Sequence, residues 1–288
     1  MTFRTRFAPS PTGPLHLGHA FSAIVAHDMA QNLGGTFLLR MDDIDRVRSK
    51  PEFEKQAMDD LHWLGLRWPE PVRKQSRSAL HFKALIDQLS YMGLVYPCSC
   101  SRADVEQASD APQEGVPTHG PDGRIYPGTC RNRDMGSYEN GDAIRLNVAK
   151  ATKVGNLPSF TETGPRFEGG HRLSAEDLQA TIGDFVVSRR DTGAAYHLAV
   201  VADDTDQKIN HVVRGEDLFE ATRIHVLLCH LLELPIPVYH HHRLIRDQNG
   251  KRLAKRDDAR ALAKYRSDGA TPQDIRRMLG LPVQSAAI

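Results

Sequence analysis

The sequence lacks an excess of charge of either sign, and it lacks a long apolar run. Its 37 lysines and arginines nearly balance 36 aspartates and glutamates, which leaves a formal net charge of +1 over 288 residues. Binding of nucleic acid through overall basicity is therefore excluded, and any such contact must be local. No apolar run approaches membrane-spanning length, and Arg4 and Arg6 are not followed by the apolar core of a signal peptide. We expect a cytoplasmic monomer with no membrane partner.

Cysteine is scarce as well, with four residues in the whole chain. So few thiols in a cytoplasmic protein do not indicate a disulfide framework. Cys229 lies in an apolar run and is predicted to be a buried helix residue. The other three share a polar stretch with a tyrosine, as Cys98, Cys100, Tyr126 and Cys130. Three thiols and a phenol at this spacing could hold a tetrahedral Zn²⁺, although spacing alone equally allows three free thiols.

Proline and glycine are concentrated near the N-terminus, in the segment from Phe7 to Ala20. A short strand over residues 4–8 leads into a turn that the prolines make rigid. A helix is predicted to begin at residue 17 or 18 and to end at Gly34, because glycine is the usual residue just beyond a helix C-terminus. The sequence therefore predicts a strand, a rigid turn and a helix in close succession.

Two histidines, His16 and His19, lie at the start of that helix with Gly18 between them. The first backbone N–H groups of a helix have no partner within it, and together with the helix dipole they attract anions. Gly18 would let a flat ligand lie against the backbone. A histidine pair at a helix start can equally be an ordinary surface feature. As a site, it suits a triphosphate and can stabilise the charge that develops on a departing pyrophosphate.

An α/β fold with a parallel sheet follows from the next segment. Residues 36–41 read as a buried strand, which completes a β-α-β unit. The two strands of such a unit are normally parallel with a right-handed crossover, and ligands bind at their carboxyl ends. Asp42 follows the second strand directly, so we expect it near the two histidines.

The rest of the chain extends this pattern. We expect a strand over 208–214 and helices over 51–66, 76–93, 215–233, 258–265 and 271–279. The apolar segments 184–190 and 195–202 flank a turn at 191–193 and predict a β-hairpin. Residues 96–141 are rich in Ser, Pro, Gly and Asp, which predicts an insertion with little regular structure. The run His240 to His242 is not expected to hold one metal ion, because neighbouring residues of a strand point to opposite faces.

The N-terminal string resembles the HIGH signature of class I aminoacyl-tRNA synthetases, in particular the glutamyl and glutaminyl branch with its Arg-Phe-Ala-Pro-Ser-Pro-Thr-Gly lead-in. A late basic run, residues 249–256, is by itself typical of a solvated face. Together with the N-terminal string it resembles the second signature of that family, KMSKS. Leu253 and Lys255 match that signature, whereas Arg252 and Ala254 replace its first Lys and its Ser.

The resemblance implies a Rossmann-type parallel-sheet catalytic domain with a zinc-containing insertion and a short helical C-terminus. In such a domain a substrate carboxylate attacks the α-phosphorus of ATP, carried with Mg²⁺, and expels pyrophosphate. The resemblance assigns this catalysis to His16, His19 and Lys255, which also contact ATP together with Pro9 and Gly18. It places the first half of the catalytic domain at 1–95, the insertion with its connecting region at 96–180, the second half at 181–257 and the C-terminal segment at 258–288.

The resemblance also implies that the activated acid is L-glutamate. The glutamate contacts of the family map onto Arg6, Ala8, Ser10, Asp42, Tyr196 and Arg214. Two guanidinium groups are what a dicarboxylic substrate requires, because each can bind a carboxylate with two hydrogen bonds. Asp42 stands where the family carries a Glu that holds the substrate ammonium, and it is one methylene shorter.

The short C-terminal segment and the cysteine stretch indicate one branch of this family. Only 32 residues follow Arg256, too few for an anticodon-binding domain of usual size. Catalytic cores of this kind resemble glutamyl-queuosine tRNA(Asp) synthetases, which transfer glutamate to queuosine in the anticodon of tRNA(Asp). This implies ATP, L-glutamate and queuosine-containing tRNA(Asp) as partners, and Zn²⁺ held by the three clustered cysteines and Tyr126. Two alternatives remain open: a truncated glutamyl-tRNA synthetase that charges a tRNA 3′ end, and an inactive RNA-binding paralogue, which the replacements Arg252 and Ala254 favour.

Overall fold

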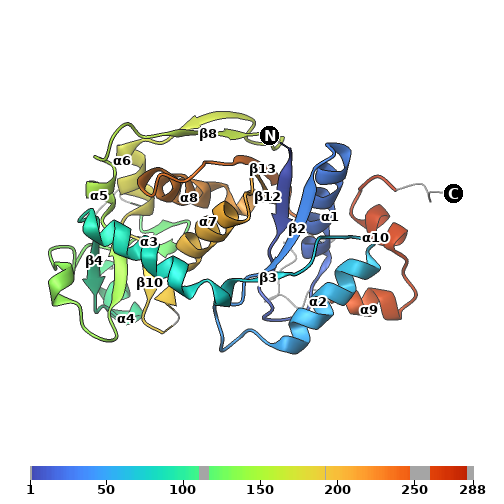
Figure 1. The fold of residues 1–288 in the computed structure, drawn as a ribbon, viewed down its shortest axis with the longest axis horizontal. Helices are drawn as coiled ribbons and strands as arrows, with labels where there is room; N and C mark the ends of the chain where they lie inside the picture. Colours follow the sequence, from blue (N-terminus) through green and yellow to red (C-terminus); the bar gives the residue numbers. More distant parts are fainter. Residues whose placement is uncertain (1, 110–116, 192, 247–259, 284–288) are drawn as a thin grey trace.

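The computed structural model describes residues 2–109, 117–191, 193–246 and 260–283. The N-terminal part of its central sheet, which we call the first half-sheet, is built on the β-α-β unit (Figure 1). β1 (Arg4–Phe7) pairs in parallel with β2 (Thr36–Met41), and β2 pairs in parallel with β3 (Arg73–Lys74). α1 (Leu17–Asn32) connects the first two strands, and α2 (Pro51–Trp63) lies between the second and the third along the chain. The predicted strand, helix and parallel strand are confirmed.

A second half-sheet continues the first one at the edge of β1. Its order is β12 (His211–Gly215), β13 (Val238–His242), β8 (Ser159–Glu162) and β9 (Gly169–Arg172). The first three strands are parallel, and β9 is antiparallel to β8. β12 lies beside β1, and the backbone N–H of Asn210 donates to the carbonyl of Arg4. The strand order therefore reverses between β1 and β12, which is where ligands bind in open α/β sheets.

A third, antiparallel sheet lies at the other end of the molecule from the C-terminus (Figure 1), and it combines two strands of the predicted insertion with two strands that follow residue 180. Its order is β11 (Gly193–Ala194), β10 (Val186–Arg189), β7 (Ala143–Leu146) and β4 (Val95–Cys98). The small hairpin of β5 (His119–Gly120) and β6 (Gly123–Arg124) accompanies it. Between residues 75 and 182 the chain also forms the helices α3 (Ala79–Tyr91), α4 (Arg102–Ser109), α5 (Val148–Ala151) and α6 (Ala175–Asp177), the 3₁₀ turns η1 (Gln75–Arg77) and η2 (Met135–Ser137) and the π-helical segment η3 (Leu178–Ile182).

The prediction of a strand over 195–202 is wrong. The hairpin around residue 191 is short, with β10 paired to β11, and the chain then forms α7 (Tyr196–Asp206). Eight consecutive residues of this helix, 197–204, are buried. Because every face of α7 is covered, its sequence has no polar stripe and reads as a continuous apolar run, which a buried strand would also give.

Helix α8 (Phe219–Leu231) follows the turn η4 (Glu216–Leu218) and connects β12 to β13 of the second half-sheet. This confirms the helix expected over 215–233. Cys229 is buried on α8, as predicted. The helices expected over 51–66 and 76–93 are also present as α2 and α3.

The C-terminal segment forms α9 (Leu262–Ser267) and α10 (Pro272–Met278), drawn in red beside α1 and α2 in Figure 1. The first of these helices was expected to begin at 258, but in the described part of the chain it begins at Leu262. Ala261 forms a β-bridge with His16 instead, and the N–H of Leu262 donates to the carbonyl of Leu15. This pairing holds the backbone extended just before the helix. Among the described residues no helix is both long and apolar enough to cross a membrane.

Candidate active site

A cavity of about 350 Å³ lies where the two half-sheets meet, at the carboxyl ends of β1, β2, β12 and β13. Eight of the residues that the sequence predicts to bind ATP or glutamate line it together: Arg6, Ala8, His16, Gly18, His19, Asp42, Tyr196 and Arg214. Pro9 and Ser10 are not among the lining residues. The carbonyl of Pro9 accepts the N–H of Asp42, and the carbonyl of Ser10 accepts the N–H of Thr12, so both shape the turn that precedes α1.

The histidine pair caps the N-terminus of α1. Nδ1 of His16 accepts the N–H of Gly18 at 3.1 Å, and Nδ1 of His19 accepts the N–H of His16 at 3.2 Å. The two ring centroids are 3.8 Å apart. Because Nδ1 of each ring is an acceptor, the proton of each neutral ring is on Nε2. Both imidazoles can therefore donate from Nε2 to an anion at the helix start, where the helix dipole adds to the attraction.

An arginine–aspartate network forms the floor of the cavity. Arg6 donates to both carboxylate oxygens of Asp204, at 2.9 and 3.0 Å. Arg40, which is 0% exposed, donates to Asp204 at 2.6 Å and to Asp42 at 2.7 Å. Burial opposes the charge of Arg40, but the two aspartates outweigh it and raise its pKa. Burial raises the pKa of Asp42, against the pull of Arg40.

Arg214 lies at the end of β12 in the wall of the same cavity. Its guanidinium donates to Nε2 of His241 at 3.1 Å, to Nδ1 of His225 at 3.0 Å and to the hydroxyl of Thr222 at 2.8 Å. Among the described residues it forms no ion pair with a carboxylate. Burial lowers the pKa of Arg214. A buried cation without a carboxylate partner is costly unless an anion binds it, so this position favours an anionic ligand.

The charges of the cavity suit a dicarboxylic amino acid. Arg6, Asp42 and Arg214 line the cavity, and Arg40 and Asp204 pair with Asp42 and Arg6 behind its wall. The side chain of Asp42 remains close enough to the cavity to bind a ligand ammonium group. The guanidinium of Arg214, which lines the same cavity, can bind a carboxylate of the ligand. No role was assigned from the sequence to Arg40, Asp204, His225 or His241.

Lys255, the remaining predicted catalytic residue, lies outside the described residues, as do Arg252, Leu253 and Ala254. The described residues on both sides of this segment lie at the cavity. Ile245 lines it, and Ala261 is paired with His16.

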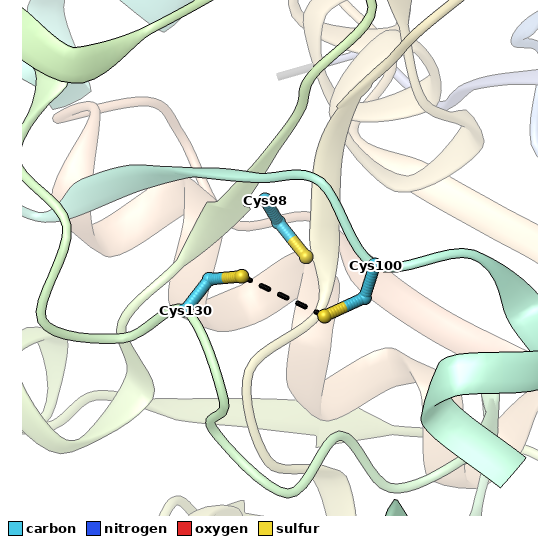
Figure 2. A group of neighbouring side chains, drawn as sticks. All are labelled: Cys98, Cys100 and Cys130. Atoms are coloured by element: carbon cyan, nitrogen blue, oxygen red, sulfur yellow. Dashed lines mark hydrogen bonds between the residues drawn. The ribbon is translucent and has the colours of Figure 1, made fainter. Parts of the chain in front are cut away.

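The cysteine insertion brings its three thiols together. The Sγ atoms of Cys98, Cys100 and Cys130 all lie within 4.8 Å of one another (Figure 2). The hydroxyl of Tyr126 lies 3.4 Å from Sγ of Cys98 and 3.4 Å from Sγ of Cys100. It also accepts the N–H of Cys130 at 2.8 Å. The four cysteines of the chain are free thiols, so this cluster is not a disulfide.

The surroundings act differently on the thiols of the cluster, and burial raises the pKa of Cys100. Arg145 donates to Sγ of Cys98 at 3.4 Å, and its guanidinium lies 3.9 Å from the ring centroid of Tyr126. Burial alone would raise the pKa of Cys130, but hydrogen bonds with Tyr126 and Ser99 lower that pKa to about 6. Three sulfur atoms and a phenolic oxygen at these distances can bind a metal ion, and soft thiolate donors in a four-ligand set suit zinc.

Comparison with known proteins agrees with this geometry. Residues 2–286 match the family described as tRNA synthetases class I (E and Q), catalytic domain. A glutamyl-Q tRNA(Asp) synthetase from Rhodobacter capsulatus is 57% identical over 284 residues, which cover 96% of this chain and 99% of that protein. One from Nocardia farcinica is 38% identical, over 96% of this chain and 85% of that protein. The chain belongs to the glutamyl-Q tRNA(Asp) synthetases of class I.

A solved structure shows the same fold in a longer protein. A glutamate tRNA ligase from Elizabethkingia meningosepticum, in complex with its amino acid, superposes with a TM-score of 0.73 at 25% sequence identity. The match covers 95% of this chain and 59% of that one, so the chain spans about three fifths of the length of the ligase. A methionyl-tRNA synthetase from Mycobacterium tuberculosis shares the fold with a TM-score of 0.58.

Proposed function

We propose that the chain activates L-glutamate with ATP and transfers the glutamyl group to queuosine in the anticodon of tRNA(Asp). The observation that carries the proposal is that Arg214 and Asp42 line one cavity together with the start of α1. Among the described residues the buried Arg214 guanidinium has no carboxylate partner, and the Asp42 carboxylate lines the same cavity, which suits the two charged ends of glutamate. Support also comes from relatives named glutamyl-Q tRNA(Asp) synthetase, one of which matches over 99% of its length.

The chemistry needs no nucleophile from the protein. A carboxylate oxygen of glutamate attacks the α-phosphorus of ATP, the bond to the β-phosphate oxygen breaks, and pyrophosphate leaves to give glutamyl-adenylate. Catalysis then depends on the alignment of the two reactants and on positive charge or donors where the leaving group forms. His16 and His19 donate from Nε2 at that place, and Lys255 supplies a cation. Mg²⁺ accompanies the phosphates of ATP.

The second step is acyl transfer. A hydroxyl oxygen of the cyclopentenediol of queuosine attacks the acyl carbon of the adenylate, and AMP leaves. The product is a glutamyl ester on the modified anticodon base. Pro9 and Ser10 act through the backbone turn, Ala8 and Gly18 through their small size, and Tyr196 through its position at the mouth of the cavity.

We also propose that Cys98, Cys100, Tyr126 and Cys130 hold Zn²⁺. Zinc in a closed set of four protein ligands supplies no chemistry to the reaction and stabilises the fold around it. Here it would join β4 to the loop that carries Cys130 (Figure 2).

Two measurements test the proposed function. The first is glutamate-dependent exchange of labelled pyrophosphate into ATP without tRNA. The second is transfer of labelled glutamate to tRNA(Asp) with and without queuosine, followed by nuclease cleavage to find the labelled nucleoside. We expect exchange without tRNA and label only in the anticodon of queuosine-containing tRNA(Asp). Label on the 3′-terminal nucleoside would instead show a truncated glutamyl-tRNA synthetase, and no exchange or transfer under any condition would show an inactive paralogue.

A further inference from the structure

Arg214 is connected to two carboxylates through imidazole rings and not through direct ion pairs. On one side, His241 lies between Arg214 and Glu162. On the other side, His225 and then His197 lie between Arg214 and Asp122. The rings are buried, with exposed fractions of 1% for His241, 2% for His225 and 5% for His197.

Arg214 fixes the direction of the hydrogen bonds that it makes itself, because a guanidinium can only donate. Its Nε donates to Nε2 of His241, so that nitrogen carries no proton. The proton of this neutral ring is therefore on Nδ1, which faces the carboxylate of Glu162 in a short hydrogen bond. Glu162 is held in turn by the N–H groups of His241 and Gly164.

The positions of the protons in the second branch follow from Arg214 in the same way, but through two histidines instead of one. Nη1 of Arg214 donates to Nδ1 of His225 at 3.0 Å, so the proton of His225 is on Nε2. That nitrogen lies 3.0 Å from Nδ1 of His197 and donates to it. The proton of His197 is then on Nε2, which lies 3.2 Å from Oδ1 of Asp122. The negative charge of Asp122 favours a proton on that nitrogen, so both ends of the branch require the same arrangement.

Asp122 belongs to the insertion and not to the two half-sheets. It lies in the turn between β5 and β6, four residues before Tyr126 of the cysteine cluster. Its side chain is 45% exposed, whereas the two rings beyond it are buried. Without its charge, His197 loses the preference for a proton on Nε2. A proton on Nδ1 of His197 would face the N–H of His225. If the proton of His225 moved to its Nδ1, that N–H would face the donor of Arg214.

We propose that Asp122 is a positioning residue of the amino-acid cavity, which fixes the tautomers of His197 and His225 and thereby the orientation of the Arg214 guanidinium. The role in catalysis rests on the proposed function, in which Arg214 binds a carboxylate of glutamate. The network itself does not depend on it. The insertion thus contributes to amino-acid binding through a path of neighbouring polar side chains, without touching the amino acid.

The kinetic test uses Asp122→Ala in the full-length protein. We expect the KM for glutamate in ATP–pyrophosphate exchange to rise about five-fold, the effect of one lost hydrogen bond, while kcat and the KM for ATP change less than about two-fold. Asp191→Ala is the matched control, because it removes an exposed acid from the same recess beside His197. An unchanged KM for glutamate in Asp122→Ala, or equal increases for glutamate and ATP, would overturn the proposal.

A second measurement does not need activity. Nitrogen-15 NMR of the histidine rings distinguishes a proton on Nδ1 from one on Nε2. In the unmodified protein we expect His197 and His225 to carry it on Nε2, and in Asp122→Ala we expect a mixture of tautomers at His197. Tautomers that are the same in both proteins would overturn the proposal even if the exchange assay succeeds. If the unmodified protein shows no glutamate-dependent exchange, the proposed function fails, and this measurement still decides whether the network exists.

Discussion

Arg276 of α10 and Asp28 of α1 form a bidentate ion pair, in which the two Nη atoms lie 2.7 and 2.8 Å from the carboxylate oxygens. Arg276 is 4% exposed, so the pair is largely shielded from water. It fixes the C-terminal helices against α1, whose N-terminus carries the histidine pair. The β-bridge between Ala261 and His16 is a second contact of the same kind. The C-terminal segment therefore supports the anion-binding end of the cavity.

Removal of this ion pair should weaken both the fold and ATP binding. Arg276→Ala removes the bidentate partner of the partly buried Asp28 carboxylate, so we expect the free energy of unfolding to fall by about 3 kcal/mol. We expect the KM for ATP to rise more than the KM for glutamate, because α9 and α10 support the histidine side of the cavity. Urea denaturation and exchange kinetics measure the two effects. The control is Arg277→Ala, whose exposed pair with Asp274 is worth less than about 1 kcal/mol, and equal losses in the two variants would contradict the prediction.

Glu162 should make stability depend on pH. Burial alone would raise its pKa, but hydrogen bonds from His241 and Gly164 lower that pKa from 4.5 to about 2. Because the folded-state pKa lies below the unfolded one, the stabilisation is complete above pH 4.5 and is lost as the pH falls through about 2. The difference in pKa corresponds to about 3 kcal/mol. We expect Glu162→Gln to lose about that amount at pH 7 and to approach the unmodified protein at low pH.

Chemical denaturation at a series of pH values between 7 and 3 tests this dependence. Glu168→Gln provides the comparison, because Glu168 is an exposed acid close by in the chain. Its free energy of unfolding should follow that of the unmodified protein at every pH. A loss in Glu162→Gln that stays the same across the whole range would show that the effect is not the charge of the carboxylate.

The first β-α-β unit could be predicted because its signals are local. The prolines before His16 and the glycine at position 34 bound α1, and the positions of β1 and β2 follow from it. The helix α7 could not be predicted, because a helix that is covered on all sides loses the periodicity that distinguishes it from a buried strand. Its burial between the insertion and the second half-sheet depends on segments far away in the sequence.

In the candidate site, too, local signals in the sequence were informative and contacts between distant segments were not. The residues at strand ends, such as Asp42 and Arg214, could be placed at one cavity because parallel strands end at the same edge of a sheet. Their partners could not be placed. Arg40 lies within a strand that reads as apolar, and His225 lies in the middle of an apolar helix. Only the packed structure shows that these buried polar groups meet the strand ends.

The proximity of the three thiols in the cysteine cluster leads us to expect a bound metal ion. We expect the purified protein to contain about one equivalent of zinc, and Cys130→Ser to lose most of it, because the loss of one thiolate opens the ligand set. Elemental analysis after dialysis measures this. Cys229→Ser is the matched control, since that thiol is buried on α8 away from the cluster. Equal zinc content in the two variants would exclude the cluster as the site.

Arg214 provides the most direct test of the amino-acid cavity. Arg214→Lys keeps the positive charge but removes the planar fork, whose Nε and Nη1 donate to His241 and His225. We expect kcat/KM for glutamate in ATP–pyrophosphate exchange to fall at least about 100-fold, the effect of about two lost charge-assisted hydrogen bonds. The KM for ATP should change less than about two-fold, because we propose that the phosphates bind at the histidine pair and not at Arg214.

The matched substitution for this test is Arg166→Lys, which changes a side chain that is 66% exposed and far less constrained. It should leave both kinetic constants within about two-fold of the unmodified protein. A charge alone would suffice if Arg214 acted only by attraction, and Arg214→Lys would then stay active. Retained activity in that variant would therefore assign the carboxylate of glutamate to another group, and Arg6 would be the next to test, because it lines the same cavity while paired with Asp204.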